Sequence, residues 1–135
     1  MSDTNKLNGG QVIIDYLIKE KVPYVFGLCG HGNIGLIDAM HERQDDIGTI
    51  SVHHESVAGF MADVYYRVSG QPTATFTSCG PGSANLPISL GNAFFDSVPF
   101  LAIIKNRMQE EEACRVRAHG YRRMAIIECR IIIMF

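Results

Sequence analysis

Residues 51–70, SVHHESVAGFMADVYYRVSG, read as the end of a strand, a turn and a helix that stops at Gly70. Four side chains of the expected helix recur at helical spacing and form an apolar stripe: Ala58, Met61, Ala62 and Tyr65. Such a stripe is typical of a helix that packs one face against a hydrophobic core. The helix is therefore expected to lie on the body of the domain and not at its margin.

Glu55 lies in the first turn of this helix, three residues before Ala58 and seven before Ala62, so it points along the apolar stripe. Burial disfavours the charged form of a carboxylate, and the positive end of the helix dipole partly offsets that cost. An acid in such a position is a candidate for chemistry. The alternative is an acid that only complements the helix dipole and remains solvated.

Strands and helices alternate along residues 9–104. Short apolar runs predict strands at residues 24–28, 49–52, 72–77 and 98–104. Helical spacing predicts helices at 9–21, 34–44 and 83–95, besides the helix of Glu55; Asn33 is a plausible N-cap, and Pro87 and Gly91 interrupt the last helix. The fold class we expect is α/β, with a mostly parallel sheet and helices on both faces.

Unusual turns follow the first three predicted strands. They are residues 29–33 (CGHGN), the turn that leads to Glu55, and residues 78–82 (SCGPG). In open α/β sheets, ligands bind beyond the carboxyl ends of the strands. We therefore expect these three turns to meet at one edge of the sheet and to form a binding site there.

The composition limits the class of protein. A chain of 135 residues with 47% hydrophobic residues is enough for about one domain, and its net charge of −2 argues against a dedicated nucleic-acid binder. The four cysteines form no C-x-x-C pair, so we expect reduced thiols and no metal site. The polar N-terminus has no secretory signal, and the apolar runs are too short for a bilayer, so we expect a cytoplasmic protein without a membrane partner.

The charge changes sign near the C-terminal end. Residues 1–104 carry ten acidic against five basic side chains, whereas residues 105–135 carry four acidic against seven basic ones. The second segment can be drawn as a charged helix at 110–124 and a strand at 125–135, without comparable turn signals. Its Arg115/Arg117 and Arg122/Arg123 pairs could contact phosphates or a partner protein, or could lie on a solvated helix face.

Gly30, Gly32 and Gly35 fit the pattern G-x-G-x-x-G after a strand, and Glu55 follows twenty residues after Gly35. This is the pattern of an NAD(P)-binding Rossmann-type module, with the acid placed for a ribose hydroxyl. Two features count against it. A strong helix precedes the first strand, and Glu55 lies inside the following helix instead of at the strand tip.

Three motifs together carry a resemblance to a known family: VFGLCGHGN (25–33), HHESVAGFMADVYYRVSG (53–70) and TSCGPGSANLPISLGNAFFDSVPFLAI (77–103). In this order they resemble the N-terminal pyrimidine-binding (PYR) domain of thiamine-diphosphate-dependent enzymes. The closest resemblance is to the acetolactate synthase group of 2-oxoacid carboligases and decarboxylases, which are transferases and lyases. The resemblance runs from about Gly10 to Ile104.

The resemblance implies roles for single residues. Glu55 matches the catalytic glutamate that hydrogen-bonds the aminopyrimidine ring of thiamine diphosphate and favours its imino tautomer. Ser78, Pro81 and Asn85 match positions that line the cofactor. The turn Cys29-Gly30-His31 matches a loop near the reactive carbon, where members often carry Pro-Gly-Gly.

Two departures from the family pattern concern histidines and cysteines. His31 stands where Gly is common and could act as acid or base, or could only shape the wall of the site. Cys29 stands where Pro is common, and Cys79 is read as a small buried residue and not as a nucleophile. Of the adjacent His53 and His54, at most one is expected to matter, because neighbouring side chains at a strand end face opposite ways.

The resemblance stops after Ile104, which divides the chain into a lead-in (1–9), a partial domain (10–104) and a divergent tail (105–135). The Phe-Gln-Glu segment of the family is missing, and so is the Gly-Asp-Gly…Asn-Asn segment that holds Mg²⁺ and the diphosphate. We therefore expect a truncated fold that is inactive alone. Either the tail is a frameshift product, or a homo-oligomer or a second subunit completes the site around a small 2-oxo acid; FAD occurs in some relatives.

A sheet of about four strands leaves an apolar edge and face uncovered. We expect such a chain to self-associate or to be poorly soluble, unless the segment Ile131–Ile133 adds a further strand.

Overall fold

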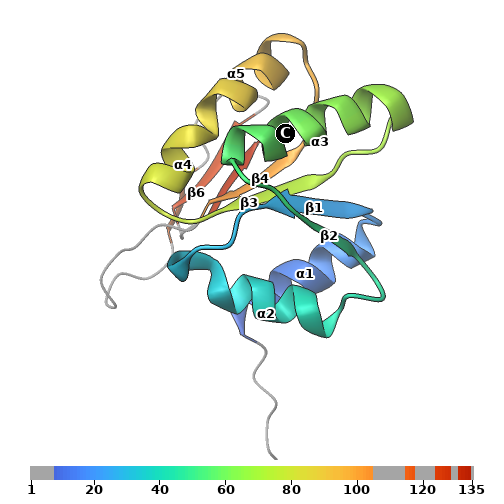
Figure 1. The fold of residues 1–135 in the computed structure, drawn as a ribbon, viewed down its shortest axis with the longest axis vertical. Helices are drawn as coiled ribbons and strands as arrows, with labels where there is room; N and C mark the ends of the chain where they lie inside the picture. The colour runs from blue at the N-terminus through green and yellow to red at the C-terminus, as the bar shows by residue number, and fades with distance from the viewer. Residues whose placement is uncertain (1–7, 105–114, 118–123, 129–130, 135) are drawn as a thin grey trace, which may run out of the picture.

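The computed structural model describes residues 8–104, 115–117, 124–128 and 131–134. Its main sheet has four parallel strands in the order β2-β1-β3-β4 (Figure 1). The strands are β1 (Tyr24–Gly27), β2 (Gly48–Ser51), β3 (Ala74–Thr77) and β4 (Leu101–Ile104). The helices are α1 (Gly9–Lys19), α2 (Ile34–Glu42), α3 (Glu55–Ser69), α4 (Pro81–Asn85) and α5 (Pro87–Phe95), with a short 3-10 helix η1 (His31–Asn33).

Helices cover both faces of the main sheet, which confirms the predicted α/β class. α1 and α2 lie on one face, and α3, α4 and α5 lie on the other (Figure 1). Successive residues of each strand point to opposite faces, so Val25 packs with the α1/α2 cluster and Phe26 with the α3/α5 cluster. All four residues of β3 are buried, as expected for a central parallel strand.

α3 has a defined start and end. The side chain of His54 accepts a hydrogen bond from the backbone N–H of Ser56, and Gly70 ends the helix with φ of +73°. The predicted apolar stripe is buried at Ala58 and Ala62 and half-buried at Met61 and Tyr65. No helix within the described ranges is long and apolar enough to cross a membrane.

α3 and α5 pack closely because each contributes a small residue at their contact. A Cβ atom added to Gly59 of α3 would lie 1.9 Å from the Ser89 hydroxyl of α5, closer than any real contact. Ser89 is fully buried and donates its hydroxyl to the carbonyl of Leu86 at 2.8 Å. The glycine therefore sets the distance between the two helices.

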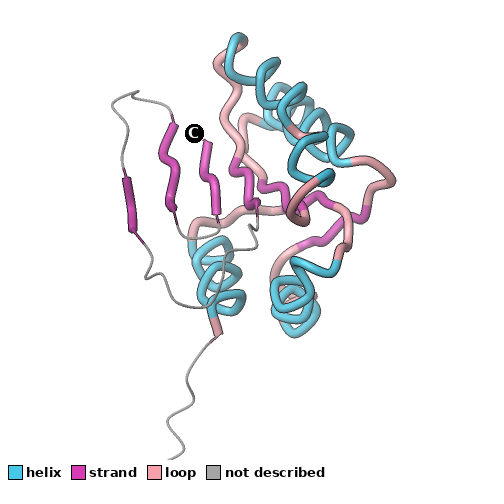
Figure 2. Tube along the Cα trace, turned by 90° about the vertical axis from the view of Figure 1, so that its left-hand side faces the viewer, coloured by secondary structure: helices cyan, strands magenta, loops and turns pink. Residues whose placement is uncertain are grey.

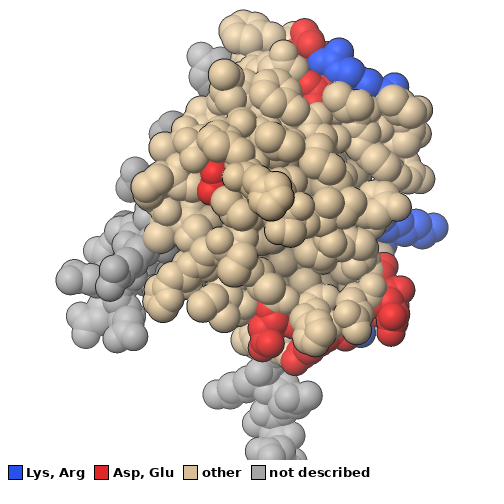
Figure 3. Space-filling view, in the orientation of Figure 1, with Lys and Arg blue, Asp and Glu red and all other residues tan. Residues whose placement is uncertain are grey.

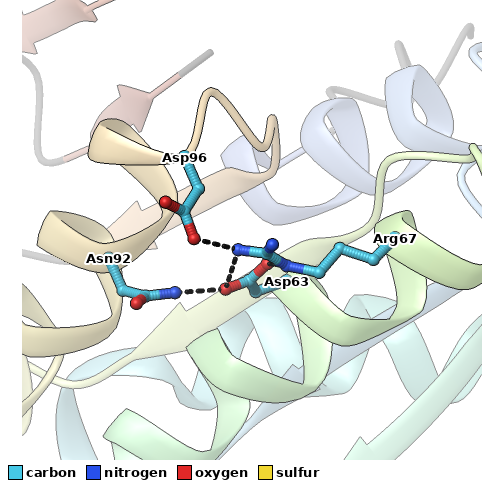
Figure 4. A network of polar contacts seen from close by, with 4 residues as sticks. All are labelled: Asp63, Arg67, Asn92 and Asp96. Carbon is cyan, nitrogen blue, oxygen red and sulfur yellow. Dashed lines mark hydrogen bonds and ion pairs between the residues drawn. The ribbon is translucent and has the colours of Figure 1, made fainter.

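A buried carboxylate provides a second link between α3 and α5 (Figure 4). Asp63 is 3% exposed and pairs with Arg67 one turn later on α3, while Asn92 of α5 donates its side-chain amide to the same carboxylate. Arg67 also reaches Asp96, just after α5. The hydrogen bonds that Arg67 donates, first to Asp63 and then to Asp96, raise the pKa of the Arg67 guanidinium above its usual range.

Two predictions about helix breaks and caps were wrong, and one was confirmed. Gly91 lies within α5 without interrupting it, whereas the interruption predicted at Pro87 is confirmed, because α4 and α5 are separate helices that meet at Leu86. Pro87 lacks the N–H that a continuous helix would need, which explains the break. Asn33 precedes α2 but makes no capping hydrogen bond, because its side chain is used within the preceding loop.

The C-terminal segment contains three short strands of a second, antiparallel sheet, shown side by side in Figure 2: β5 (Arg115–Arg117), β6 (Met124–Glu128) and β7 (Ile131–Met134). The helix drawn over 110–124 is therefore wrong at residues 115–117, whose polar-apolar-polar order suits a strand. Residues 110–114 and 118–123 lie outside the described residues. β7 approaches β4 but is not hydrogen-bonded into the main sheet.

The Gly59 contact predicts opposite effects for two Gly→Ala substitutions within helices. Gly59→Ala should lower the free energy of unfolding by about 1–3 kcal/mol, because its methyl group must displace Ser89. Gly91→Ala should raise that free energy by up to about 1 kcal/mol, because a Cβ there meets no atom within 4 Å. Urea denaturation of both variants measures the difference, and equal effects would contradict the assigned contact.

The Asp63 network predicts unequal roles for two arginines of equal exposure. The side chains of Arg67 and Arg43 are both 44% exposed, but Arg67 pairs with a carboxylate that is 4% exposed and Arg43 with carboxylates that are about half exposed. Arg67→Ala should lower the melting temperature clearly, because it strips a partner from a buried charge. Arg43→Ala, the matched control, should have little effect. Equal shifts in calorimetry would refute this assignment.

Candidate functional site

The loops that follow β1 and β3 touch each other at the carboxyl edge of the main sheet. The N–H of Gly32 donates to the hydroxyl of Ser78 at 3.2 Å. A Cβ on Gly30 would lie 2.5 Å from the Cβ of Ser78, and one on Gly32 would lie 2.8 Å from its hydroxyl. Gly30 is therefore required for the two loops to approach so closely, whereas a side chain at position 32 would have to displace the Ser78 hydroxyl.

Asn33 holds the loop after β1 in shape. Its side chain is 2% exposed, donates to the carbonyl of Leu28 at 3.0 Å and accepts from the N–H of Gly30 at 2.9 Å. These two bonds close the turn that carries Cys29 and His31. The loop is thus held in shape by bonds within itself.

Glu55 lies at the first residue of α3 and is 7% exposed, as its place along the apolar stripe predicts. Its Oε2 accepts a hydrogen bond from the side-chain amide of Asn85, the last residue of α4, at 2.9 Å. A Cβ on Gly82 would lie 2.9 Å from Oε1 and 3.7 Å from the Cβ of Ser78. Gly82 therefore lies between the carboxylate and the loop contact at Ser78.

The turn between β3 and α4 brings Asn85 and Gly82 to the carboxylate. Gly80 has φ of +70°, a conformation that side chains with a Cβ rarely adopt, and Pro81 begins α4 where its missing N–H costs nothing. The sharp turn lets the short helix α4 run back past the N-terminus of α3 (Figure 1). Glu55 is thus contacted by α4 at both of its carboxylate oxygens, through Asn85 at Oε2 and beside Gly82 at Oε1.

The predicted site residues fall into two groups. Glu55 contacts Asn85, and Gly30 contacts Ser78, so the structure joins these four in two pairs bridged by Gly82. Three others lie exposed at the same edge without a hydrogen bond or ion pair in the described ranges: Cys29, His31 and Pro81.

Gly82 and Asn33 are parts of the site that the sequence interpretation missed. Gly82 was read only as a turn residue, although the G-P-G pattern did indicate a close backbone approach in this loop. Asn33 was read as a helix cap, because asparagine before an apolar helix is usually one. Neither contact could be read from local spacing, because Gly82 meets a residue 27 positions earlier and Asn33 turns back along its own loop.

The dinucleotide alternative finds little support in this geometry. In that motif the third glycine allows close packing of helix and strand. A Cβ on Gly35, however, would meet no atom within 4 Å, and Glu55 accepts the Asn85 amide from within a helix. Among the described residues, no group of three or more His, Cys, Asp or Glu side chains could hold a metal ion.

Comparison with known proteins agrees with the geometry. The chain is 38% identical over 103 residues to a probable 2-ketoarginine decarboxylase of Pseudomonas aeruginosa, covering 76% of this chain and 18% of that protein. It is 37% identical over 98 residues to the acetolactate synthase large subunit of Haemophilus influenzae (73% and 17%), and 34% identical over 95 residues to the mitochondrial acetolactate synthase catalytic subunit of Saccharomyces cerevisiae (70% and 14%). The chain thus spans less than a fifth of the length of these relatives.

A family profile covers most of the chain. Residues 7–126 match the profile described as thiamine pyrophosphate enzyme, N-terminal TPP binding domain, and this match continues past residue 104 into the tail. The order of the three motifs and the parallel sheet that presents them agree with that match. The chain therefore belongs to the family of thiamine-diphosphate-dependent enzymes, as their N-terminal cofactor-binding domain.

Proposed function

We propose that this chain forms the aminopyrimidine half-site for thiamine diphosphate in a 2-oxoacid carboligase or decarboxylase that resembles acetolactate synthase. The observation that carries the proposal is the buried carboxylate of Glu55. One of its oxygens is held by Asn85, and the other, Oε1, has no hydrogen-bond partner in the part of the chain that the structure describes.

The residues present fit the pyrimidine of the cofactor. An aminopyrimidine offers a ring nitrogen that can share a proton with a carboxyl group, and Oε1 is available for that bond. The backbone of Gly82 leaves room beside Oε1 that any side chain would fill. When bound, thiamine diphosphate supplies a nucleophilic carbon for attack on a 2-oxo acid. The chain itself contributes orientation, exclusion of water and a proton-holding group at Oε1.

Asn85 has a separate task in this proposal. By donating to Oε2 it fixes the plane of the Glu55 carboxyl group, so that Oε1 faces the open side. We further propose that Ser78, Gly30 and Pro81 line the cofactor, because they flank the same gap at the sheet edge. His31 and Cys29, exposed on the loop after β1, are proposed to face the reacting carbon, with His31 as a possible acid or base for the substrate.

The half-site needs a second half for catalysis. We propose that a subunit carrying the diphosphate- and Mg²⁺-binding segment completes it, and that without this partner the chain is inactive in the cytoplasm. We also propose residue 104 as the boundary between the domain and its tail.

An apolar surface on the outer side of α3 supports the need for a partner. Four exposed side chains follow each other along one side of the helix: Val57, Phe60, Val64 and Val68. Ile88 and Phe95 of α5 are exposed as well. The face on which α3 lies has few charged atoms away from its rim (Figure 3). Apolar patches of this kind are normally covered in a functional assembly.

The first prediction of the proposal concerns ligand binding. Calorimetric titration should detect binding of thiamine diphosphate to the chain, and Glu55→Gln should weaken it about tenfold, because the amide loses the charge-assisted bond. Glu20→Gln, at the exposed end of α1, is the control and should bind as the unchanged chain does.

The same titration separates the alternative function. NADH should not bind at millimolar concentration, whereas a dinucleotide-binding module would take it up and thiamine diphosphate would not. The purified chain should also fail to turn over pyruvate. Turnover without any partner would overturn the proposal that the half-site is incomplete.

The second prediction concerns the apolar surface of α3. Light scattering should show that the chain alone self-associates, because association removes the exposed apolar face of α3 from contact with water. Val64→Lys with Val68→Lys should shift the scattering toward monomer, since both side chains are more than half exposed and contribute little to the core. A clean monomer before any substitution would show that this surface does not drive association.

A further inference from the structure

His54 immediately precedes Glu55 and caps the helix that carries it. Its exposed imidazole accepts a hydrogen bond at Nδ1 from the backbone N–H of Ser56, at 3.3 Å, and the same nitrogen lies 2.7 Å from the Ser56 hydroxyl. The carbonyl of His54 accepts from the N–H of Val57 at 3.1 Å. The first turn of α3 thus depends on His54 at two points.

The bond from the Ser56 N–H to Nδ1 requires one protonation state of the ring. A backbone N–H can only donate, so Nδ1 must carry a lone pair, and the ring proton must be on Nε2. A second proton on the ring would convert Nδ1 into a donor, which opposes the backbone N–H of Ser56 and leaves the Ser56 hydroxyl as its acceptor, so the bond to the helix backbone is lost. It would also put a positive charge at the positive end of the helix dipole. The cap therefore exists only with a neutral imidazole.

We propose that His54 is a positioning residue that holds the carboxyl group of Glu55 against Asn85 only while its imidazole is neutral, which makes the pyrimidine half-site sensitive to mildly acidic pH. Glu55 is the first residue of α3, so fraying of the first turn displaces its carboxylate before any other contact of the helix. Histidine is the side chain that ordinarily changes charge between about pH 5 and 8. The inference rests on the role proposed for Glu55 above.

Few other titratable groups face His54. The helices α4 and α5 and the strands β3 and β4 contain none among their residues, and β1 contains only Tyr24 at its far end. α3 itself carries Asp63, Tyr65, Tyr66 and Arg67 at least two turns further on. The titratable groups at the same sheet edge are Glu55, His53, His31, Cys29 and Cys79. The Glu55 carboxylate favours a cation nearby, so it partly offsets the cost of a charged His54 ring.

Two measurements between about pH 7.5 and 5.5 test the proposal. The first follows the Ser56 backbone amide and the Asn85 side-chain amide by NMR, without ligand. Both signals should shift together as the pH falls, and the protection of the Ser56 amide against exchange, relative to an unstructured chain at the same pH, should fall about fivefold. The second is titration with thiamine diphosphate at each pH, where affinity should fall several-fold in step with the NMR change.

The decisive variant is His54→Asn. Asparagine is a strong helix cap that does not titrate. In this variant, neither the two amide signals nor the affinity for thiamine diphosphate should change as the pH falls. The ligand's own titration is the same for all variants and cancels in the comparison. His53→Asn is the matched control, because it removes the neighbouring exposed imidazole, and it should keep the full pH dependence.

The outcomes separate this inference from the proposed function. If His54→Asn retains the pH dependence of the unchanged chain, or if the Ser56 amide does not shift, the inference is wrong, even where thiamine diphosphate binds through Glu55. If both amides shift and His54→Asn abolishes the shift while no thiamine diphosphate binds at any pH, the cap controls Glu55 as stated and the proposed function fails instead.

Discussion

The hydrogen bond between Glu55 and Asn85 is the interaction on which the arrangement of this domain depends. A carboxylate that is almost fully removed from water needs a partner, or its burial is costly. The Asn85 amide donates to one oxygen of Glu55, and the sharp turn at Gly80 after β3 brings this amide within reach of the carboxylate. The site is therefore assembled from α3 and α4, two helices that follow different strands.

α3 is held along its whole length by polar contacts that differ in kind. His54 caps its start, Asp63 ties its middle to α5, and Gly70 ends it. Between these points Gly59 allows α5 to approach without an intervening side chain. A helix fixed in this way cannot slide or rotate easily as a body, so the position of the carboxylate at its first residue depends on the first turn alone.

The sequence predicted most of the fold because apolar periodicity is a local signal. The strands, the flanking helices, the parallel sheet and the burial of Glu55 all follow from it, and the three motifs identified the family. The contacts of Gly82, Asn33 and Asp63 could not be predicted, because each depends on where another loop or helix lies in space. The helix drawn at 110–124 failed at residues 115–117 because charge was given more weight than alternation.

The contact between Gly82 and Glu55 also constrains how the two positions can change during evolution. A side chain at position 82 would place its Cβ 2.9 Å from Oε1 and would have to push the glutamate carboxylate aside. A shorter aspartate would withdraw the carboxylate and release position 82 to accept a side chain. In lineages that lose the acid, the glycine should therefore also be lost, so that the two positions change together. Gly35 can vary independently, because a Cβ there meets no atom within 4 Å.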